Sequence, residues 1–598
     1  MKHFLLSLIF FLLIFPAAFS QINISPAAKT WADSVFKTLN YDQQIAQLMI
    51  LRESEITKNG IVYYDQKITE AINKYNIGGI CLFQGSPVKQ ADFINQFQRI
   101  AKTPLMVCID AEWGLGMRLD SVIPLNHQLM LGAVQDASII YQFGTIVGEQ
   151  CKREGINVNF APVVDINNNP KNPVINDRSF GEDKYKVALF GIQYMKGLQD
   201  NGVLACAKHF PGHGDVAVDS HLDLPIINKT KAQLDSLELY PFREMFNAGV
   251  GSVMVAHLYI PAIDNTPNTA TSLSKNNVTG LLRNELGYQG LTFTDALGMQ
   301  GVAKFFPSGE ASAQSLIAGN DMLVLPVDVP DAIEKIKDAI SNKKLSWDDI
   351  AAKCKKVLAM KYMLGLANKS IVNTENLTHD LNRRSNDIKR IVAENAITLL
   401  AREGAQFAPL KQSANSSSKD IAYVAIGTSG DNAFAKRLRN DYYADVFYFN
   451  YKQDASRILS MVQLIKTRYR SVVIGIHAYA RYPANNFGIS KAATDLALQL
   501  QQLTNSITFV FGNPYAVKNF CSAKNLVACY EDDEITQNTA ADLLEGKISA
   551  KGKMPVTICD QFKYGSGIIT YNNSLPVVNP KNAGLDSVKL LAIDSIAT

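Results

Sequence analysis

Short, almost wholly apolar runs alternate with longer amphipathic segments through the first 365 residues of the chain. Apolar runs of this kind are typical of parallel strands that are buried on both faces, and the intervening segments repeat with helical periodicity. Eight such runs occur, at 47–51, 79–83, 105–109, 156–161, 203–207, 252–256, 291–294 and 322–325. Eight strands that alternate with helices predict an α/β fold, a (β/α)8 TIM barrel.

A second alternation of strands and helices follows a polar stretch. Its strands are predicted at 421–426, 446–449, 472–476, 507–511 and 526–530, and its helices at 455–466, 491–502 and 534–544. This pattern is typical of an open α/β sandwich domain. The predicted organisation is therefore a barrel over 21–365, a linker over 366–386, the sandwich over 387–564 and a tail over 565–598. The tail ends like the start of another helix, which leaves open whether a further domain follows.

Titratable side chains follow four of the predicted barrel strands. They are Asp110 after the third strand, Lys208 and His209 after the fifth, His257 after the sixth and Asp295 after the seventh. The carboxyl ends of all strands in such a barrel meet at one mouth, where barrel enzymes keep their catalytic groups. A single charge merely solvates a loop, but four strands with converging charges predict a pocket.

Two carboxylates in this set suggest acid–base and nucleophilic chemistry. Asp295 ends a buried strand, where it is either a nucleophile for a sugar C1 or the cap of a following helix. Asp219 and His221 stand two residues apart in a loop and so face the same side if the loop is extended. Asp219 would then hold one tautomer of His221, which would act as a general acid and base, unless the histidine is an ordinary surface residue.

The spacing of His209 and His213 suggests a metal pair only if the segment is helical. Pro211, Gly212 and Gly214 exclude a continuous helix, so no metal site is predicted and His213 is expected to brace the loop from within.

Composition and charge exclude some function classes. The formal net charge of +4 is spread without a basic block, which gives no electrostatic footprint for nucleic acid. Lys2, an apolar run of about 12 residues and small residues up to Ser20 predict a signal peptide over 1–20 and export to the periplasm or medium. That run is too short for a stable membrane span. Cysteines in apolar runs, among them Cys529 and Cys559, are typical of buried thiols, although a Cys521–Cys529 disulfide remains an alternative.

The loop segment carries a specific family resemblance. The residues Lys208-His209-Phe210-Pro211-Gly212-His213-Gly214, followed by Asp219-Ser220-His221 and Pro225, resemble the signature of the β-N-acetylglucosaminidases of glycoside hydrolase family 3. Further segments resemble other parts of the pattern of the two-domain members, at 109–114, 176–181, 294–297, 512–515 and 552–556, with Arg118 at the position of the family's arginine.

The resemblance implies an exported, retaining exo-β-N-acetylglucosaminidase that acts on cell-wall or related amino-sugar glycans without a metal or organic cofactor. It implies that Asp295 is the nucleophile and that His221, assisted by Asp219, is the acid/base. The substrate-binding residues that follow from it and from the strand ends are Asp110, Arg118, Arg178, Lys208, His209 and His257. Arginine, lysine and aspartate suit this role because they form charged, bidentate hydrogen bonds with hydroxyl groups.

Two departures and three alternatives accompany this prediction. Trp113 replaces a glycine and could stack in an outer sugar subsite, and Ala296 replaces a second aspartate. A histidine acid/base would not repel an anionic acceptor, so phosphorolysis is an alternative to hydrolysis. A β-glucosidase and an inactive glycan-binding protein are the others. The sequence does not indicate an oligomeric state.

Overall fold

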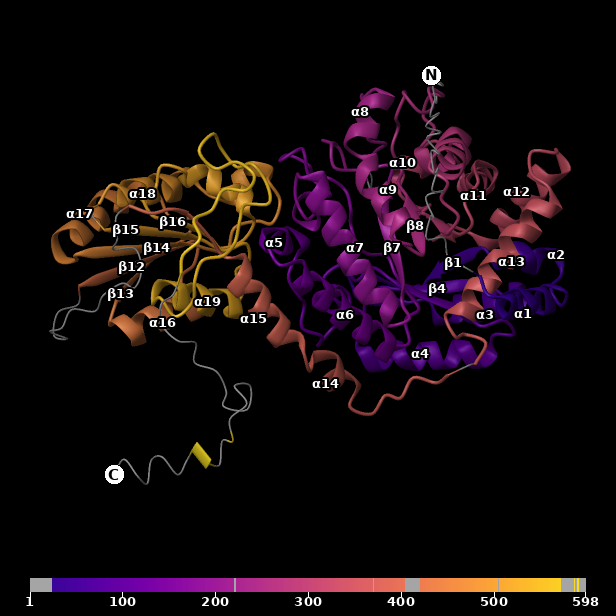
Figure 1. The fold of residues 1–598 in the computed structure, drawn as a ribbon, viewed down its shortest axis with the longest axis horizontal. Helices are drawn as coiled ribbons and strands as arrows, with labels where there is room; N and C mark the ends of the chain where they lie inside the picture. Colours follow the sequence, from indigo (N-terminus) through magenta and orange to yellow (C-terminus); the bar gives the residue numbers. More distant parts are fainter. Residues whose placement is uncertain are drawn as a thin grey trace, which may run out of the picture.

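The computed structural model of the protein describes residues 24–219, 222–368, 370–403, 420–503, 505–571, 586 and 589–590. The predicted signal peptide and His221 lie outside these ranges. The described chain forms a barrel domain and a sheet domain that lie side by side, as Figure 1 shows. Among the described residues, no helix has the length and apolar character that crossing a bilayer would require.

Eight parallel strands form the barrel in the order β10-β1-β4-β5-β6-β7-β8-β9. An additional bridge between Phe293 and Met322 brings the two ends of this sheet together. The predicted (β/α)8 barrel is therefore confirmed. The strands are β1 (Met49–Arg52), β4 (Gly79–Leu82), β5 (Met106–Ile109), β6 (Val158–Asn159), β7 (Leu204–Phe210), β8 (Ser252–Val255), β9 (Leu291–Thr294) and β10 (Leu323–Val324).

The helices that surround the strands begin and end at the positions that capping chemistry favours. Asp136, for example, accepts a hydrogen bond from the Ser138 amide at the start of α6, and Gly155 ends that helix in the left-handed conformation. The helices are α1 (Pro26–Phe36), α2 (Tyr41–Ala46), α3 (Asp65–Tyr75), α4 (Pro87–Ile100), α5 (Gln128–Ala133), α6 (Ala137–Glu154), α7 (Lys184–Asp200), α8 (Lys231–Ser236), α9 (Leu239–Asn247), α10 (Gln300–Ala303), α11 (Ser308–Ala318), α12 (Val329–Ser341) and α13 (Trp347–Met363). A hairpin of β2 (Ser54–Thr57) and β3 (Gly60–Tyr63) and the short helical segments η1 (Leu115–Met117), η2 (Asn176–Arg178), η3 (Thr271–Leu273) and η4 (Asn276–Glu285) complete the barrel domain.

The predicted helix over 231–247 is broken into α8 and α9. Leu237 leaves the helical conformation, with φ −125° and ψ −79°. Pro241 lies in the first turn of α9, where a residue without an amide N–H is tolerated because that N–H would have no partner within the helix.

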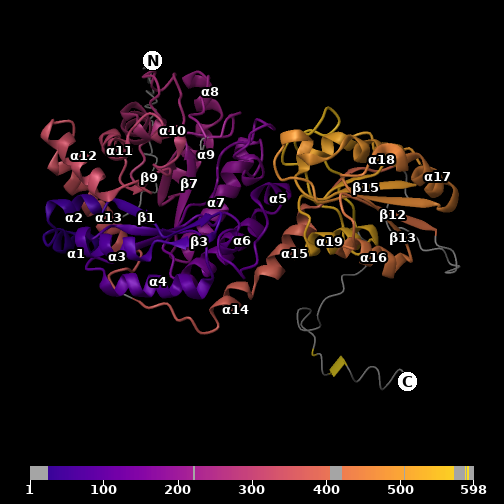
Figure 2. The ribbon, with the colours of Figure 1, turned by 180° about the vertical axis from the view of Figure 1, so that it is seen from behind.

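The second domain has a six-stranded sheet in the order β11-β16-β15-β14-β12-β13, with β11 antiparallel to β16 and the other pairs parallel. Helices cover both faces of the sheet, α17 and α18 on one and α15, α16 and α19 on the other (Figure 2). The predicted α/β sandwich is confirmed. Its strands are β11 (Thr398–Ala401), β12 (Ile421–Ile426), β13 (Asp445–Phe449), β14 (Ser471–Ile476), β15 (Ser506–Val510) and β16 (Leu526–Ala528). Its helices are α15 (Ser385–Ala396), α16 (Ala433–Tyr442), α17 (Ile458–Arg468), α18 (Lys491–Gln501) and α19 (Glu534–Leu544), with short helical segments η5 (Ala455–Arg457), η6 (Ala484–Gly488) and η7 (Pro514–Phe520).

Two elements of this domain, β11 and α16, escaped the sequence analysis. Strand β11 follows α15 with one residue between them, so no turn signal separates it from the helix. Helix α16 is strongly polar, and only Phe434, Ala435, Leu438 and Tyr442 are buried.

The segment expected as a linker, residues 366–386, carries α14 (Leu377–Asn382) and the first two residues of α15. It is bound to the barrel, because Arg153 Nε lies 2.9 Å from Asp380 Oδ2 and the Ile123 amide donates to Asn382 over 2.8 Å.

A disulfide joins Cys521 to Cys559, which corrects two expectations from the sequence. Cys529 is a free buried thiol and not the partner of Cys521, because it follows β16 with its side chain inside the core. Cys559, expected to be a buried thiol, lies after the short segment that joins the sheet domain to the barrel.

Candidate functional site

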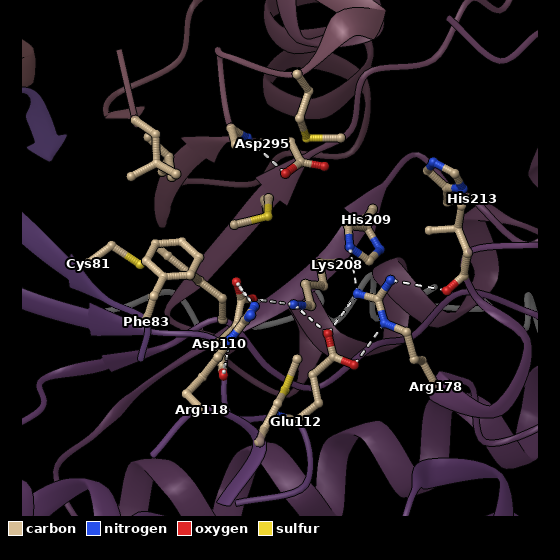
Figure 3. Close-up of a pocket in the computed structure, with 18 of the residues that line it drawn as sticks. Cys81, Phe83, Asp110, Glu112, Arg118, Arg178, Lys208, His209, His213 and Asp295 are labelled. Atoms are coloured by element: carbon tan, nitrogen blue, oxygen red, sulfur yellow. Dashed lines mark hydrogen bonds and ion pairs between the residues drawn. The ribbon is translucent and has the colours of Figure 1, made fainter. Parts of the chain in front are cut away.

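A pocket of about 450 Å³ opens at the carboxyl ends of the barrel strands (Figure 3). This volume is within the range of pockets that enclose small ligands. Six of the nine residues predicted for the site line it: Asp110, Arg118, Arg178, Lys208, His209 and Asp295. The barrel topology therefore brings together side chains that are up to 185 positions apart in the sequence, from 110 to 295.

Asp295 follows β9 and lies across the pocket from the other charged groups (Figure 3). One of its carboxylate oxygens, Oδ1, accepts a hydrogen bond from the Ala296 amide over 2.8 Å. The next helix, α10, begins after Met299, so Asp295 does not cap it. The alternative of a capping aspartate is therefore wrong, and the carboxylate faces the pocket.

His257 lies behind this segment and does not line the pocket. The side chain is fully buried, with Nδ1 2.7 Å from Ser272 Oγ and Nε2 3.0 Å from the Ala296 carbonyl oxygen. The expectation that His257 binds substrate is therefore corrected, because both ring nitrogens have protein partners. Its geometry suits support of the backbone that carries Asp295.

A chain of alternating charges forms the floor of the pocket. It runs from Arg118 through Asp110, Lys208 and Glu112 to Arg178 (Figure 3). Lys208 Nζ lies 2.7 Å from Asp110 Oδ1 and 2.7 Å from Glu112 Oε1. Arg178 binds Glu112 through two hydrogen bonds of 2.9 and 2.7 Å. Paired charges of this kind are pre-organised to exchange partners with sugar hydroxyl groups.

The electrostatics keep every member of this chain ionised. Burial by itself raises the pKa of Glu112, but the Arg178 and Lys208 charges outweigh it and hold that pKa well below its usual value. Burial has the same effect on Asp110, where Lys208 and Arg118 hold the pKa low. Burial lowers the pKa of Lys208, yet Asp110 and Glu112 raise it overall. The floor is therefore charged across the physiological pH range.

Lys208 and His209 lie within β7, and not after the strand as the sequence suggested. Neighbouring residues of a regular strand point to opposite faces. The register between β7 and β8 shifts between Ala207 and Phe210, which is the kind of irregularity that redirects side chains beside active sites. Both side chains consequently line the same pocket.

Asp165 anchors the start of the loop that follows β7. Its carboxylate accepts from the backbone amides of His209 and His213 over 3.1 and 2.7 Å and lies 2.7 Å from His209 Nδ1. Burial raises the pKa of Asp165, but His209 and His213 hold it below its usual value. Burial, together with His209, lowers the pKa of His213 to about 4, so this imidazole is neutral at physiological pH.

The loop continues to Asp219, which is not among the residues that line the pocket. Its carbonyl oxygen accepts from the amides of Leu222 and Asp223 over 2.9 and 3.0 Å. His221 lies outside the described residues, so the geometry of the predicted Asp219–His221 pair stays a prediction.

Three residues of the site were not predicted as site residues from the sequence: Glu112, Asp165 and Arg481. Glu112 belongs to the quoted segment 109–114, and its position two residues after Asp110 was a usable signal. Arg481 reaches the pocket from the second domain, where no sequence pattern announces it.

Comparisons with known proteins place this site in a wider group. Residues 40–360 match the model of the glycosyl hydrolase family 3 N-terminal domain. The chain is 33% identical over 337 residues to beta-hexosaminidase A of Pseudoalteromonas piscicida, which covers 51% of this chain and 56% of that relative. It is 27% identical over 344 residues to a beta-N-acetylglucosaminidase/beta-glucosidase of Cellulomonas fimi, which covers 56% of this chain and 60% of that relative. The chain thus spans little more than half the length of these two curated relatives.

Solved structures extend the similarity over both domains. The structure of a glycoside hydrolase family 3 β-N-acetylglucosaminidase from Paenibacillus sp. str. FPU-7 is similar over 87% of this chain and 99% of that chain, with a TM-score of 0.69 and 28% sequence identity.

Proposed function

The chain belongs to glycosyl hydrolase family 3, and from this premise we propose that it is a retaining exo-β-N-acetylglucosaminidase. It would release terminal β-linked N-acetylglucosamine from cell-wall or related glycans. The observation that carries the proposal is the position of the Asp295 carboxylate, which faces a fully paired, charged floor across a pocket of about 450 Å³. A closed pocket of this size suits one terminal sugar, and the similar relatives are named for β-hexosaminidase or β-N-acetylglucosaminidase activity.

The proposed reaction proceeds by two displacements at the anomeric carbon. Asp295 attacks C1 and forms a glycosyl ester while His221, held by Asp219, protonates the departing glycosidic oxygen. A water molecule then gives a proton to His221 and attacks C1, which breaks the ester and restores the Asp295 carboxylate. Two inversions give retention of configuration. Asp110, Arg118, Lys208, Arg178 and His209 would bind the sugar hydroxyl groups, and no metal or organic cofactor takes part.

Export is part of the proposal. The predicted signal peptide over 1–20 supports it, and so does the Cys521–Cys559 disulfide, since disulfides persist outside the reducing cytosol.

A panel of chromogenic sugars tests this function on the purified chain. We expect aryl β-N-acetylglucosaminide to be cleaved with a higher kcat/KM than the matching glucoside and xyloside. Addition of phosphate should leave the rate unchanged, and the first sugar detected by NMR should be the free β-anomer. A faster glucoside would indicate a β-glucosidase, and a sugar 1-phosphate product would indicate phosphorolysis. Glycan binding without turnover would indicate an inactive binding protein.

The loop after β7 offers a second test, because it must hold one position for His221 to reach the glycosidic oxygen. A Cβ at Gly214 would lie 1.7 Å from the Ile166 carbonyl oxygen, so Gly214→Ala must displace the loop. Displacement of a catalytic group by about 1 Å lowers rates on the order of 100-fold, and we expect kcat for the aryl substrate to fall by that factor. Gly430→Ala is the control, since a Cβ there meets nothing within 4 Å. Equal activity of the two variants would exclude a role for the loop position.

A further inference from the structure

The second domain contributes side chains to the pocket that holds Asp295. Arg481 and Tyr482, which follow β14, line this pocket together with Trp113 of the barrel. The two domains lie against each other at α5 of the barrel, as Figures 1 and 2 show.

Both domains fix the position of Trp113. The Arg481 guanidinium carbon lies 4.7 Å from the centre of the Trp113 ring, and the His127 ring centre lies 4.5 Å from it. His127 in turn binds Glu531 of the second domain, with Nδ1 2.7 Å from Oε1. Trp113 is still partly exposed and lines the pocket, so part of its ring system is open to a ligand.

Arg481 is held in place and yet keeps hydrogen-bonding capacity. Its Nε and one terminal nitrogen, Nη2, donate to Asp177 over 2.5 and 2.8 Å. Among the described residues, none accepts a hydrogen bond from its other terminal nitrogen, Nη1. The guanidinium charge is compensated by Asp177, so a neutral hydroxyl group suits Nη1 better than a free anion does.

Exposure distinguishes the floor of the pocket from its mouth. The side chains of Glu112 and Lys208 are 0% and 2% exposed, whereas Arg481 is 31% exposed and Tyr482 is 41% exposed. An exo-acting enzyme that binds the terminal sugar on the floor must let the rest of the glycan leave through the mouth. The first unit beyond the scissile bond therefore passes Trp113, Arg481 and Tyr482.

We propose that Trp113, Arg481 and Tyr482 form the subsite for the sugar that leaves, and that the second domain thereby sets the preference for the leaving group. This inference rests on the proposed function. The ligand class is a neutral pyranose, because aromatic rings pack on sugar C–H faces and a fixed guanidinium donates to hydroxyl groups. Arg481 touches no reacting atom in this arrangement and acts on specificity.

The test compares two substrates with the same terminal sugar. One is the β-linked disaccharide of N-acetylglucosamine, whose second ring reaches the mouth, and the other is methyl β-N-acetylglucosaminide, whose leaving group does not. We expect Arg481→Met to lower kcat/KM for the disaccharide at least about tenfold, with little change for the methyl glycoside. Trp113→Leu should lower the same ratio. Arg439→Met is the matched control, since Arg439 also pairs with an aspartate of the second domain, Asp431, but lies on α16 and does not line the pocket.

The outcomes separate this inference from the function on which it rests. An unchanged substrate ratio in both variants overturns the subsite. Equal losses on both substrates also overturn it, because Arg481 would then act only by holding the Asp177–Arg178 turn. If the wild-type chain cleaves neither N-acetylglucosaminide, the proposed function fails, and the ratio is measured with the terminal sugar that the chromogenic panel selects.

Discussion

Replacement of Asp295 by alanine is expected to lower kcat for aryl β-N-acetylglucosaminide on the order of 10⁴-fold or more, because no other group replaces a lost nucleophile. The carboxylate lies across the pocket from the charged floor, so its removal leaves substrate binding largely in place. Steady-state kinetics on purified variant protein measure the loss, and calorimetric binding of the product sugar shows whether the pocket persists.

Azide distinguishes a nucleophile from a residue that merely shapes the strand end. A small anion that enters the space left in Asp295→Ala would attack C1 in place of the carboxylate and yield the α-glycosyl azide. Partial recovery of turnover with that product supports the assignment. Retention of wild-type activity by the variant, or an azide product of the β-configuration, would remove Asp295 from the role.

Substitution of Glu112 by glutamine is expected to damage both stability and activity. The carboxylate is fully buried between Lys208 and Arg178, and the loss of one partner from a buried ion pair costs about 3–5 kcal/mol. Both cations would lose their common anchor, so we expect kcat/KM to fall about 100-fold through misplacement of the floor. Thermal unfolding and kinetics at pH 7 provide the two measurements.

The pH dependence of this stability has a defined sign. The pKa of Glu112 in the folded protein lies well below its ordinary value of 4.5, so its contribution is present above pH 4.5 and is lost as the pH falls toward the folded pKa. The difference in unfolding temperature between wild type and Glu112→Gln should therefore be largest near neutral pH and narrow below pH 4.5. Glu334→Gln, on the exposed face of α12, is the matched control and should show no such dependence. A difference that persists unchanged at low pH would contradict the ion-pair account.

Local patterns were sufficient for the architecture but not for every boundary. Buried parallel strands require continuous apolar runs whatever their neighbours are, so the runs at 79–83 and 291–294 identified β4 and β9 directly. The end of β7 was misjudged because Lys208 and His209 are polar. Their burial depends on Asp110, Glu112 and Asp165, which the rest of the barrel brings to them.

Site residues were predictable where barrel topology alone gathers them. Asp110 and Asp295 end strands of one barrel, and strand ends of one barrel must meet. His257 also follows a strand, but the side chain turns toward Ser272 and the Ala296 carbonyl, a choice that local sequence does not reveal.

The amino-acid sequence by itself determined the barrel, the sandwich domain and the set of charged strand ends, since periodicity and residue type report burial and local backbone geometry. Only the tertiary structure decided which charges pair. Asp165 meets His209 and His213 across 44 and 48 residues, and Arg481 meets Asp177 across 304. The physical reason is that an ion pair depends on the distance between two side chains, and for residues so far apart in the chain the packing of whole domains sets that distance.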